Sequence, residues 1–236
     1  MRMYARFLSF FLAITVGTLL PSAAGAASQQ AAQATVTTKD RQVYQELLDR
    51  INDKVHVSTL DNGLTVVTIP QKHTNEAIVS MTYNAGFVHE QPHEFGMAHL
   101  VEHMIFKGTT TMREGDLDKI AQKLGISITD GGLNANTFFN RTHYYFRTDA
   151  QNWRPFIDIA ADCAQNMDWD SSVLDSELAA IFQEIKMRGD DRAGSDDEVI
   201  GSWLPDNHPY KHRGIGYKEQ LLTFSREDVL SFYHKY

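Results

Sequence analysis

The sequence predicts an α+β fold, in which a mixed or antiparallel sheet is packed by helices on one side. Two observations support this class. Short β-branched segments flank turn residues, which is typical of hairpins. The predicted strands and helices also fall into separate blocks along the chain, which favours an α+β arrangement. The 210 residues that follow the first 26 of 236 are enough for one large domain or two small ones with a hydrophobic core.

The first 26 residues have the pattern of a secretory signal peptide. Arg2 and Arg6 precede an apolar run at residues 7–20, and small residues that suit cleavage after Ala26 follow it. The run is shorter than the roughly 20 residues that a transmembrane helix needs. We therefore expect secretion across the inner membrane into the periplasm, with no membrane attachment after cleavage. An uncleaved N-terminal anchor is the alternative.

Charge and cysteine content exclude some classes of function. Without Arg2 and Arg6 the chain has 20 basic and 30 acidic side chains, a net charge of −10. Nucleic acid is therefore not an expected partner, because backbone binding needs clustered Lys and Arg. Cys163 is the only cysteine, so no internal disulfide can form. We expect it to be a small buried side chain on a helix.

The first predicted elements are a helix and a hairpin. Residues 27–40 are rich in Gln, Ala and Thr and poor in bulky apolar side chains, so we expect a disordered leader there. A short helix is predicted at residues 41–51. Strands are predicted at 55–60 and 64–69, because Asp-Asn-Gly between β-branched runs is a strong hairpin signal. A third strand at 77–83 is followed by a loop.

The later elements begin with a helix at residues 96–107, for which Gly108 is the predicted end. The elements that follow are, in order, a helix at 116–124, short strands at 126–129, 134–139 and 143–147, helices at 151–167 and 172–188, an acidic loop at 189–198, an irregular segment at 203–216 and a helix at 226–236. Ser225 is the predicted N-cap of the last helix, because its hydroxyl can accept a bond from a backbone amide.

The helix at 96–107 carries three side chains that suit a metal site. At about 100° per residue, His99, Glu102 and His103 share one helical face. Two imidazoles four residues apart can bind one Zn²⁺, and the carboxylate between them can act on water. The order His-x-x-Glu-His is the inverzincin pattern. The alternative is a surface helix whose His and Glu side chains are only solvated or paired with each other.

A third ligand is needed, because a catalytic zinc site usually has three protein ligands and one open position. Glu177 and Glu184 are seven residues apart, so both point to the same side of the helix predicted at 172–188. Leu178 and Ile181 lie beside them, which indicates that this side faces inward. Buried carboxylates need a cation or a partner, which favours a metal role over a solvated acidic face.

A second group of metal-competent side chains precedes the metal helix. His89 and His93 are four residues apart, with Glu90 and Glu94 next to them. Pro92 interrupts any helix there, so the spacing cannot place both imidazoles on one helical face. We expect this segment to be the loop that leads into the metal helix. His208, which precedes a proline, is also expected to have a structural role.

Several motifs in order resemble the pitrilysin/insulinase metallopeptidases, a family that includes the mitochondrial processing peptidases. The similarity begins near residue 60 and continues to the end of the chain. It rests on the words His-Leu-Val-Glu-His-Met-Ile-Phe-Lys-Gly-Thr at 99–109, Asn-Ala-Asn-Thr at 134–137, Arg-Thr-His-Tyr-Tyr-Phe at 141–146, His-Pro-Tyr at 208–210 and Ile-Gly at 215–216, and on the helix that carries Glu177 and Glu184. By this resemblance residues 41–236 form the N-terminal domain of such a metallopeptidase, incomplete at its C-terminal end.

The resemblance also implies a role for each site residue. His99, His103 and Glu184 are the implied zinc ligands, and Glu102 is the implied general base. Glu177 is implied to orient a histidine ligand through a hydrogen bond; its use as a ligand instead is the alternative. Asn134 and Ala135 are implied to lie on an edge strand to which an extended peptide substrate adds, and a β-turn at Asn134 is the alternative.

The resemblance implies a zinc-dependent endopeptidase that hydrolyses peptides or small polypeptides. Members of this family work as two homologous halves, in one chain or as paired subunits. We therefore expect a homologous second half or a partner subunit, and the chain to be either a fragment of a longer precursor or a subunit that depends on that partner. A non-catalytic or partner-dependent peptide-binding subunit is the alternative function.

Overall fold

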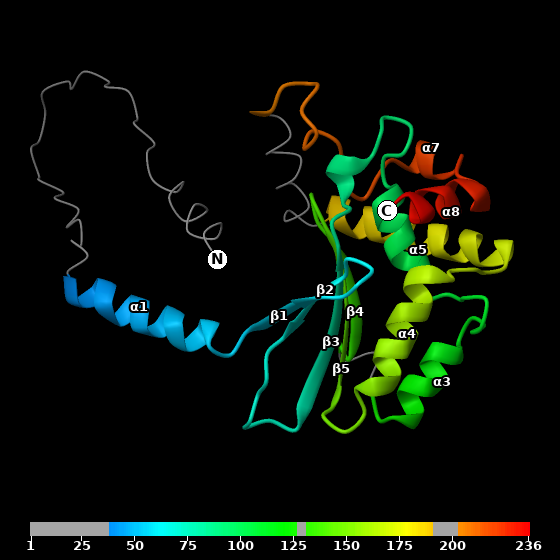
Figure 1. Ribbon diagram of the computed structural model, residues 1–236. Helices are drawn as coiled ribbons and strands as arrows, with labels where there is room; N and C mark the ends of the chain where they lie inside the picture. Colours follow the sequence, from blue (N-terminus) through cyan, green and yellow to red (C-terminus); the bar gives the residue numbers. More distant parts are fainter. Residues whose placement is uncertain (1–37, 127–130, 191–202) are drawn as a thin grey trace, which may run out of the picture. The chain divides into compact units, whose positions relative to one another are not determined.

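The computed structural model of the protein describes residues 38–126, 131–190 and 203–236 (Figure 1). The chain divides into two compact units, one up to Pro70 and the other from Gln71 onward. The predicted signal peptide, most of the predicted leader and most of the strand predicted at 126–129 lie outside the described residues. None of the described helices is long and apolar enough to span a bilayer.

The first unit contains one helix and one hairpin. Helix α1, Thr38–Asn52, begins at the end of the leader predicted at residues 27–40, so the prediction of disorder is wrong for residues 38–40. Strands β1, His56–Thr59, and β2, Thr65–Thr68, pair antiparallel, with Thr59 opposite Thr65. The Asn62 side chain accepts a hydrogen bond from the Leu64 amide, 3.1 Å. The hairpin prediction is confirmed, because Asp-Asn-Gly lies at the turn between two paired strands.

The second unit is built on an antiparallel sheet with the strand order β3-β5-β4. Its strands are β3, Glu76–Tyr83, β4, Leu133–Thr137, and β5, Thr142–Asp149. Strand β5 is central, with Tyr83 of β3 and Thr137 of β4 both opposite Thr142. Its buried and more exposed positions alternate, since side chains of a strand point alternately to opposite faces. These strands confirm the predicted third, fifth and sixth strands.

The helices of the second unit follow β3 and β5 along the chain. They are η2, a 3-10 turn at Phe87–His89, and the α-helices α2, Met97–Met104, α3, Asp116–Lys123, α4, Arg154–Gln165, α5, Ser171–Asp190, α7, Lys218–Leu221, and α8, Arg226–Lys235. Helices α3, α4 and α8 lie on one side of the sheet in Figure 1. The predicted α+β class with helices on one side of a sheet is confirmed.

The hydrophobic core of the second unit surrounds α2. Leu100 and Met104 of this helix are completely buried, as are Phe156 of α4 and Ile181 of α5. Helix α2 contacts α5, α8 and β4. Cys163 is buried on α4, as expected. Because α2 is enclosed by elements from distant parts of the chain, its orientation is set by the whole core.

Two predictions about helix ends have different outcomes. The predicted N-cap of α8 is confirmed, because the Ser225 hydroxyl accepts a bond from the Asp228 amide, 3.2 Å. The prediction that Gly108 ends the metal helix is wrong, since α2 ends at Met104. A Cβ at Gly108 would lie 2.6 Å from the carbonyl oxygen of Asp168. Glycine is therefore needed there because two backbone segments approach closely. A glycine after an apolar helical pattern can mean either a helix end or such a close approach, and the sequence does not separate the two.

Candidate metal centre

Two histidines of α2 lie next to each other. His99 is 7% exposed and His103 is half-buried, with the ring centroids 4.7 Å apart. The spacing of four residues places both imidazoles on one face of the helix, as predicted, while Leu100 and Met104 point into the core. This packing leaves the two rings few orientations, which favours a preformed site.

Helix α5 brings Glu184 to the histidine pair from a distant part of the chain. Glu184 Oε2 lies 3.3 Å from His99 Nε2 and 3.6 Å from His103 Nε2. Ligand atoms bound tetrahedrally at about 2.0–2.1 Å from Zn²⁺ lie about 3.3 Å from one another. One ligand atom from each of the three residues lies within 4.8 Å of the others. The donor set thus has the chemistry and the spacing that a zinc ion would need.

Glu177, one of the two carboxylates on the same side of α5, faces the other nitrogen of His103. Its Oε2 lies 3.2 Å from His103 Nδ1, and its Oε1 lies 2.6 Å from Lys107 Nζ. Burial raises the pKa of Glu177, but the hydrogen bonds with His103 and Lys107 outweigh it, so that its pKa is lowered. This arrangement favours Glu184 over Glu177 as the metal ligand and gives Glu177 the position of a carboxylate that orients His103.

The carboxylates give the site a negative potential. Burial by itself lowers the pKa of His103, but hydrogen bonds with Glu177 and Glu184 and the charge of Glu102 raise it to about 9. A positive charge is therefore favoured at this place, because the carboxylates of Glu102, Glu177 and Glu184 lie close together.

Glu102 lies in the same cavity as the three candidate ligands. The cavity has a volume of about 920 Å³ and is lined by His99, Glu102, His103 and Glu184, and by β4. The Thr137 hydroxyl of β4 donates a hydrogen bond to Glu102 Oε2, 2.5 Å. Glu102 therefore has a defined orientation within the cavity.

Strand β4 forms an edge of the sheet, because among the described residues it pairs only with β5. Asn134 and Ala135 line the cavity from this edge. Asn134 Oδ1 accepts a bond from the Ala135 amide, 2.9 Å. The alternative that Asn134 lies in a β-turn is wrong, since it lies within the strand and pairs with Tyr145.

Comparison with known proteins identifies the family. The family model described as Insulinase (Peptidase family M16) matches residues 65–193, which is more than half of the chain. The chain belongs to the M16 family. The matched range includes His99, Glu102, His103 and Glu184. It ends before the irregular segment at 203–216, which also lines the cavity at Ile215.

Several M16 relatives resemble this chain over part of their length. A zinc protease of Rickettsia felis is 29% identical over 79% of this chain and 44% of its own. The mitochondrial-processing peptidase subunit beta of Lentinula edodes is 31% identical over 75% and 37%. The crystal structure of the first half of the periplasmic protease PqqL from Escherichia coli has a TM-score of 0.71, with 23% identity over 77% and 39%. The chain spans less than half the length of these three proteins, and zinc is the cofactor of the M16 family.

Two side chains at the M16 site were not singled out from the sequence. Thr137 contacts Glu102, and Lys107 contacts Glu177. Alternation along β4 places Leu133, Ala135 and Thr137 on the same face. The two-residue period of the strand could therefore have predicted that Thr137 faces the same side as Ala135. Lys107 follows His103 by four residues. This spacing places two side chains next to each other only in a helix, and α2 ends at Met104, before Lys107.

The second group of histidines does not join the metal site. His89 ends η2 and His93 lies in the loop before α2, which agrees with the prediction of a loop. His208 Nδ1 accepts a bond from the Tyr210 amide, 3.1 Å, and its ring contacts the Tyr210 ring. Glu90, which the sequence places in the same loop as His93, is buried beside the start of α2.

Proposed function

We propose that this chain is the zinc-binding half of an endopeptidase that hydrolyses peptides or small polypeptides. One observation supports the proposal most directly: Glu184 Oε2 lies 3.3 Å and 3.6 Å from the Nε2 atoms of His99 and His103. These three residues would bind Zn²⁺. When bound, zinc acidifies water and polarises the carbonyl group of the scissile bond.

The proposed chemistry uses four side chains around that ion. Glu102 accepts a proton from water and donates it to the leaving amine. Thr137 keeps the Glu102 carboxylate in place through its hydroxyl group. Glu177 holds the His103 ring and Lys107 holds Glu177, so that the Nε2 atom of His103 stays directed at the site.

The free edge of β4 is the proposed binding site for an extended peptide. Two backbone hydrogen bonds flank β4: Arg147 N donates to Gly132 O, 2.7 Å, and Phe138 N donates to Arg141 O, 2.8 Å. Counting inward from them in steps of two, Asn134 and Asn136 are the residues of β4 whose backbone faces β5. Bonded positions alternate in an antiparallel pair, so the N–H and C=O of Ala135 point to the free edge. The Ala135 N–H would exchange its bond with Asn134 Oδ1 for one with the substrate strand. A substrate strand added there would lie along the cavity that contains Glu102. Backbone hydrogen bonds of this kind favour extended substrates over a particular sequence.

A homologous second half or a partner subunit is proposed to complete the cleft. The M16 relatives are more than twice as long as the part that this chain matches, and one of them is named as a subunit. We also propose a periplasmic location, supported by the basic and apolar residues at the start of the sequence and by the periplasmic PqqL among its structural neighbours.

The experiment that tests the proposal measures zinc content and cleavage of an internally quenched peptide for the chain and its Glu102→Gln variant. We expect one zinc per chain in both proteins. Cleavage should fall at least about 100-fold in the variant, because it loses the group that accepts the proton from water. Retained cleavage would refute the role of Glu102. Zinc binding together with peptide binding, but without cleavage when a second half is supplied, would support the non-catalytic alternative.

A further inference from the structure

The metal helix begins at a residue that cannot cap it. Gly96 is the N-cap of α2, with a φ of +93°, and it has no side chain to accept a bond from the first amides. A Cβ at Gly96 would lie 2.8 Å from Gly216 Cα, so the two backbones are in close contact. The amides at the start of α2 therefore need an acceptor from elsewhere.

Glu90 supplies that acceptor from six residues upstream. Its Oε2 accepts a bond from the Gly96 amide, 3.0 Å, and its Oε1 from the Ala98 amide, 2.8 Å. A negative charge at this end of a helix is also favoured by the helix dipole. Since Ala98 immediately precedes His99, the Glu90 carboxylate fixes the backbone next to a candidate zinc ligand.

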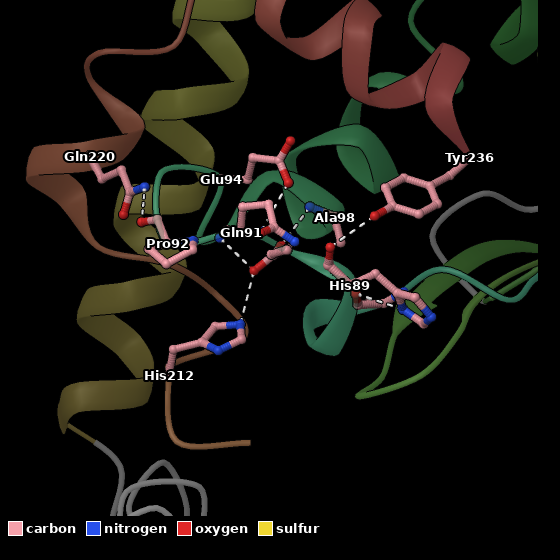
Figure 2. Close-up of polar contacts among 11 residues, drawn as sticks. His89, Gln91, Pro92, Glu94, Ala98, His212, Gln220 and Tyr236 are labelled. Carbon is pink, nitrogen blue, oxygen red and sulfur yellow. Dashed lines mark hydrogen bonds and ion pairs between the residues drawn. The ribbon is translucent and has the colours of Figure 1, made fainter. Parts of the chain in front are cut away.

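Glu90 is buried and has a third partner. Its side chain is fully enclosed, and His212 Nε2 lies 3.1 Å from its Oε2. In Figure 2, His212 points from its own segment toward the loop that leads into α2. Burial raises the pKa of Glu90, which the bonds from His212 and the two amides only partly offset. A carboxylate in such a position needs all of its partners, because an unpaired buried charge is strongly destabilising.

His212 connects this carboxylate to a wall of the metal cavity. Its ring stacks on that of Phe95, with centroids 4.0 Å apart and an angle of 11° between the planes. Gly214 and Ile215, which follow it closely, line the cavity that contains Glu102 and the candidate ligands. The Glu90–His212 pair therefore joins the start of the metal helix to a segment that lines the metal cavity.

We propose that Glu90 is a positioning residue for the zinc site: it holds the first turn of α2 so that His99 meets His103 and Glu184. Through His212 it also holds the cavity wall at Gly214 and Ile215. This inference rests on the proposed zinc-binding function. A glutamine cannot replace Glu90, because it has one acceptor oxygen and its NH₂ group would face an N–H donor.

The test compares Glu90→Gln with Glu94→Gln, a matched change in the same loop. The Glu94 side chain accepts a bond from the Gln91 amide and lies 3.5 Å from Lys235, so it contacts the loop and α8 and not the amides of α2. Zinc affinity is measured by competition with a chelator, and amide hydrogen exchange at Ala98 is measured on the zinc-free chain. We expect Glu90→Gln to weaken zinc binding about tenfold or more and to accelerate exchange at Ala98. Glu94→Gln should do neither.

A spectroscopic measurement separates positioning from a general loss of stability. The visible spectrum of Co²⁺ in the site reports ligand geometry, so it should change in Glu90→Gln and stay unchanged in Glu94→Gln. His212→Phe keeps an aromatic ring on Phe95 but removes the donor to Glu90, so it should also weaken zinc binding. His212→Gln keeps an N–H donor, so its zinc affinity should stay closer to that of the wild type. These His212 variants test the pair even if Glu90→Gln does not fold.

Two results would overturn the inference. One is a Glu90→Gln chain that binds zinc as tightly as the wild type, with the same Co²⁺ spectrum. The other is unchanged exchange at Ala98, which would show that Glu90 does not hold the helix start. If the wild-type chain binds no zinc, the proposed function fails, but the exchange comparison still decides whether Glu90 holds α2.

Discussion

At the scale of single residues, the contact between Thr137 and Glu102 joins the edge strand to the metal helix. The hydroxyl donates to a carboxylate at 2.5 Å, and hydrogen bonds to charged groups contribute more than neutral ones. Thr137 also stands opposite Thr142 in the ladder, and the Thr142 hydroxyl donates to the carbonyl group of Ala85, 2.8 Å. The position of the Thr137 hydroxyl is thus set by the sheet, which makes it suitable for orienting Glu102, the proposed general base.

A pair of substitutions at Thr137 tests this role. Thr137→Val keeps the shape of the side chain and loses the donor, so kcat for peptide cleavage should fall about tenfold with little change in KM. Thr137→Ser keeps the donor and should stay close to the wild type. Zinc content should be the same in all three proteins. Equal kcat for the Val and Ser variants would contradict the role assigned to this hydroxyl.

At the scale of secondary-structure elements, the position of Glu184 depends on the packing of α5 against α2. Ile181 of α5 is completely buried and lies one turn before Glu184. Replacing Ile181 by Ala should lower the free energy of unfolding by about 2–5 kcal/mol, because it leaves a cavity beside α2. It should also weaken zinc binding, since the helix that carries Glu184 loses packing.

Met187 offers the matched control on the same helix. Its side chain is 70% exposed, so Met187→Ala should change the free energy of unfolding by less than about 0.5 kcal/mol and leave zinc affinity unchanged. Urea unfolding and chelator competition measure the two quantities. If Ile181→Ala loses stability and keeps full zinc affinity, the packing of α5 does not control the position of Glu184.

Another contact between elements depends on pH. Asp162 of α4 accepts bonds from the hydroxyls of Thr109 and Thr111, at 2.5 Å and 2.7 Å, and from the Asn166 amide group, at 2.8 Å. Burial raises the pKa of Asp162, but these hydrogen bonds outweigh it and its pKa is lowered in the folded chain. The stabilisation is therefore present above the unfolded-state pKa of about 3.9 and is lost as the pH falls through the folded-state pKa.

Asp162→Asn tests this linkage by urea unfolding of the zinc-free chain between pH 7 and pH 3. At pH 6 the variant should be less stable than the wild type by about 1 kcal/mol. The difference should shrink as the pH approaches 3, because the wild-type carboxylate becomes protonated. A difference that stays constant over this range would mean that the Asp162 charge does not stabilise the contact between α4 and the loop at 109–112.

At the scale of the whole molecule, this chain matches less than half of each M16 relative. Its cavity combines the candidate ligands, the proposed base and a free strand edge. A second half closing over this cavity would exclude water and orient a peptide, and such positioning contributes strongly to catalysis. Zinc binding and rapid cleavage are therefore separable properties, and we expect the chain by itself to bind zinc and to cleave peptides slowly.

Co-expression with the C-terminal half of the Rickettsia felis relative tests this division. We expect zinc content to stay at one ion per chain and kcat/KM for a quenched peptide to rise about tenfold or more. The Glu102→Gln chain with the same half is the control and should remain inactive, because the base belongs to this chain. An increase that persists in the Glu102→Gln combination would place the catalytic group elsewhere.

The sequence by itself determined the local geometry of the site. His99, Glu102 and His103 share a face because helical spacing depends only on backbone geometry, and the strands around Asp-Asn-Gly follow from local turn preferences. The motif words that resemble M16 proteins also lie within short segments, so they indicate the family without any knowledge of tertiary contacts.

Only the tertiary structure decided between residues that are equivalent in local pattern. Glu177 and Glu184 lie on the same side of α5, yet one faces His103 Nδ1 and the other the two Nε2 atoms. Glu90 and Glu94 lie in the same loop, yet only Glu90 caps α2 through its side chain. The physical reason is that periodicity fixes a direction around one element, whereas contact depends on how elements far apart in the chain pack together.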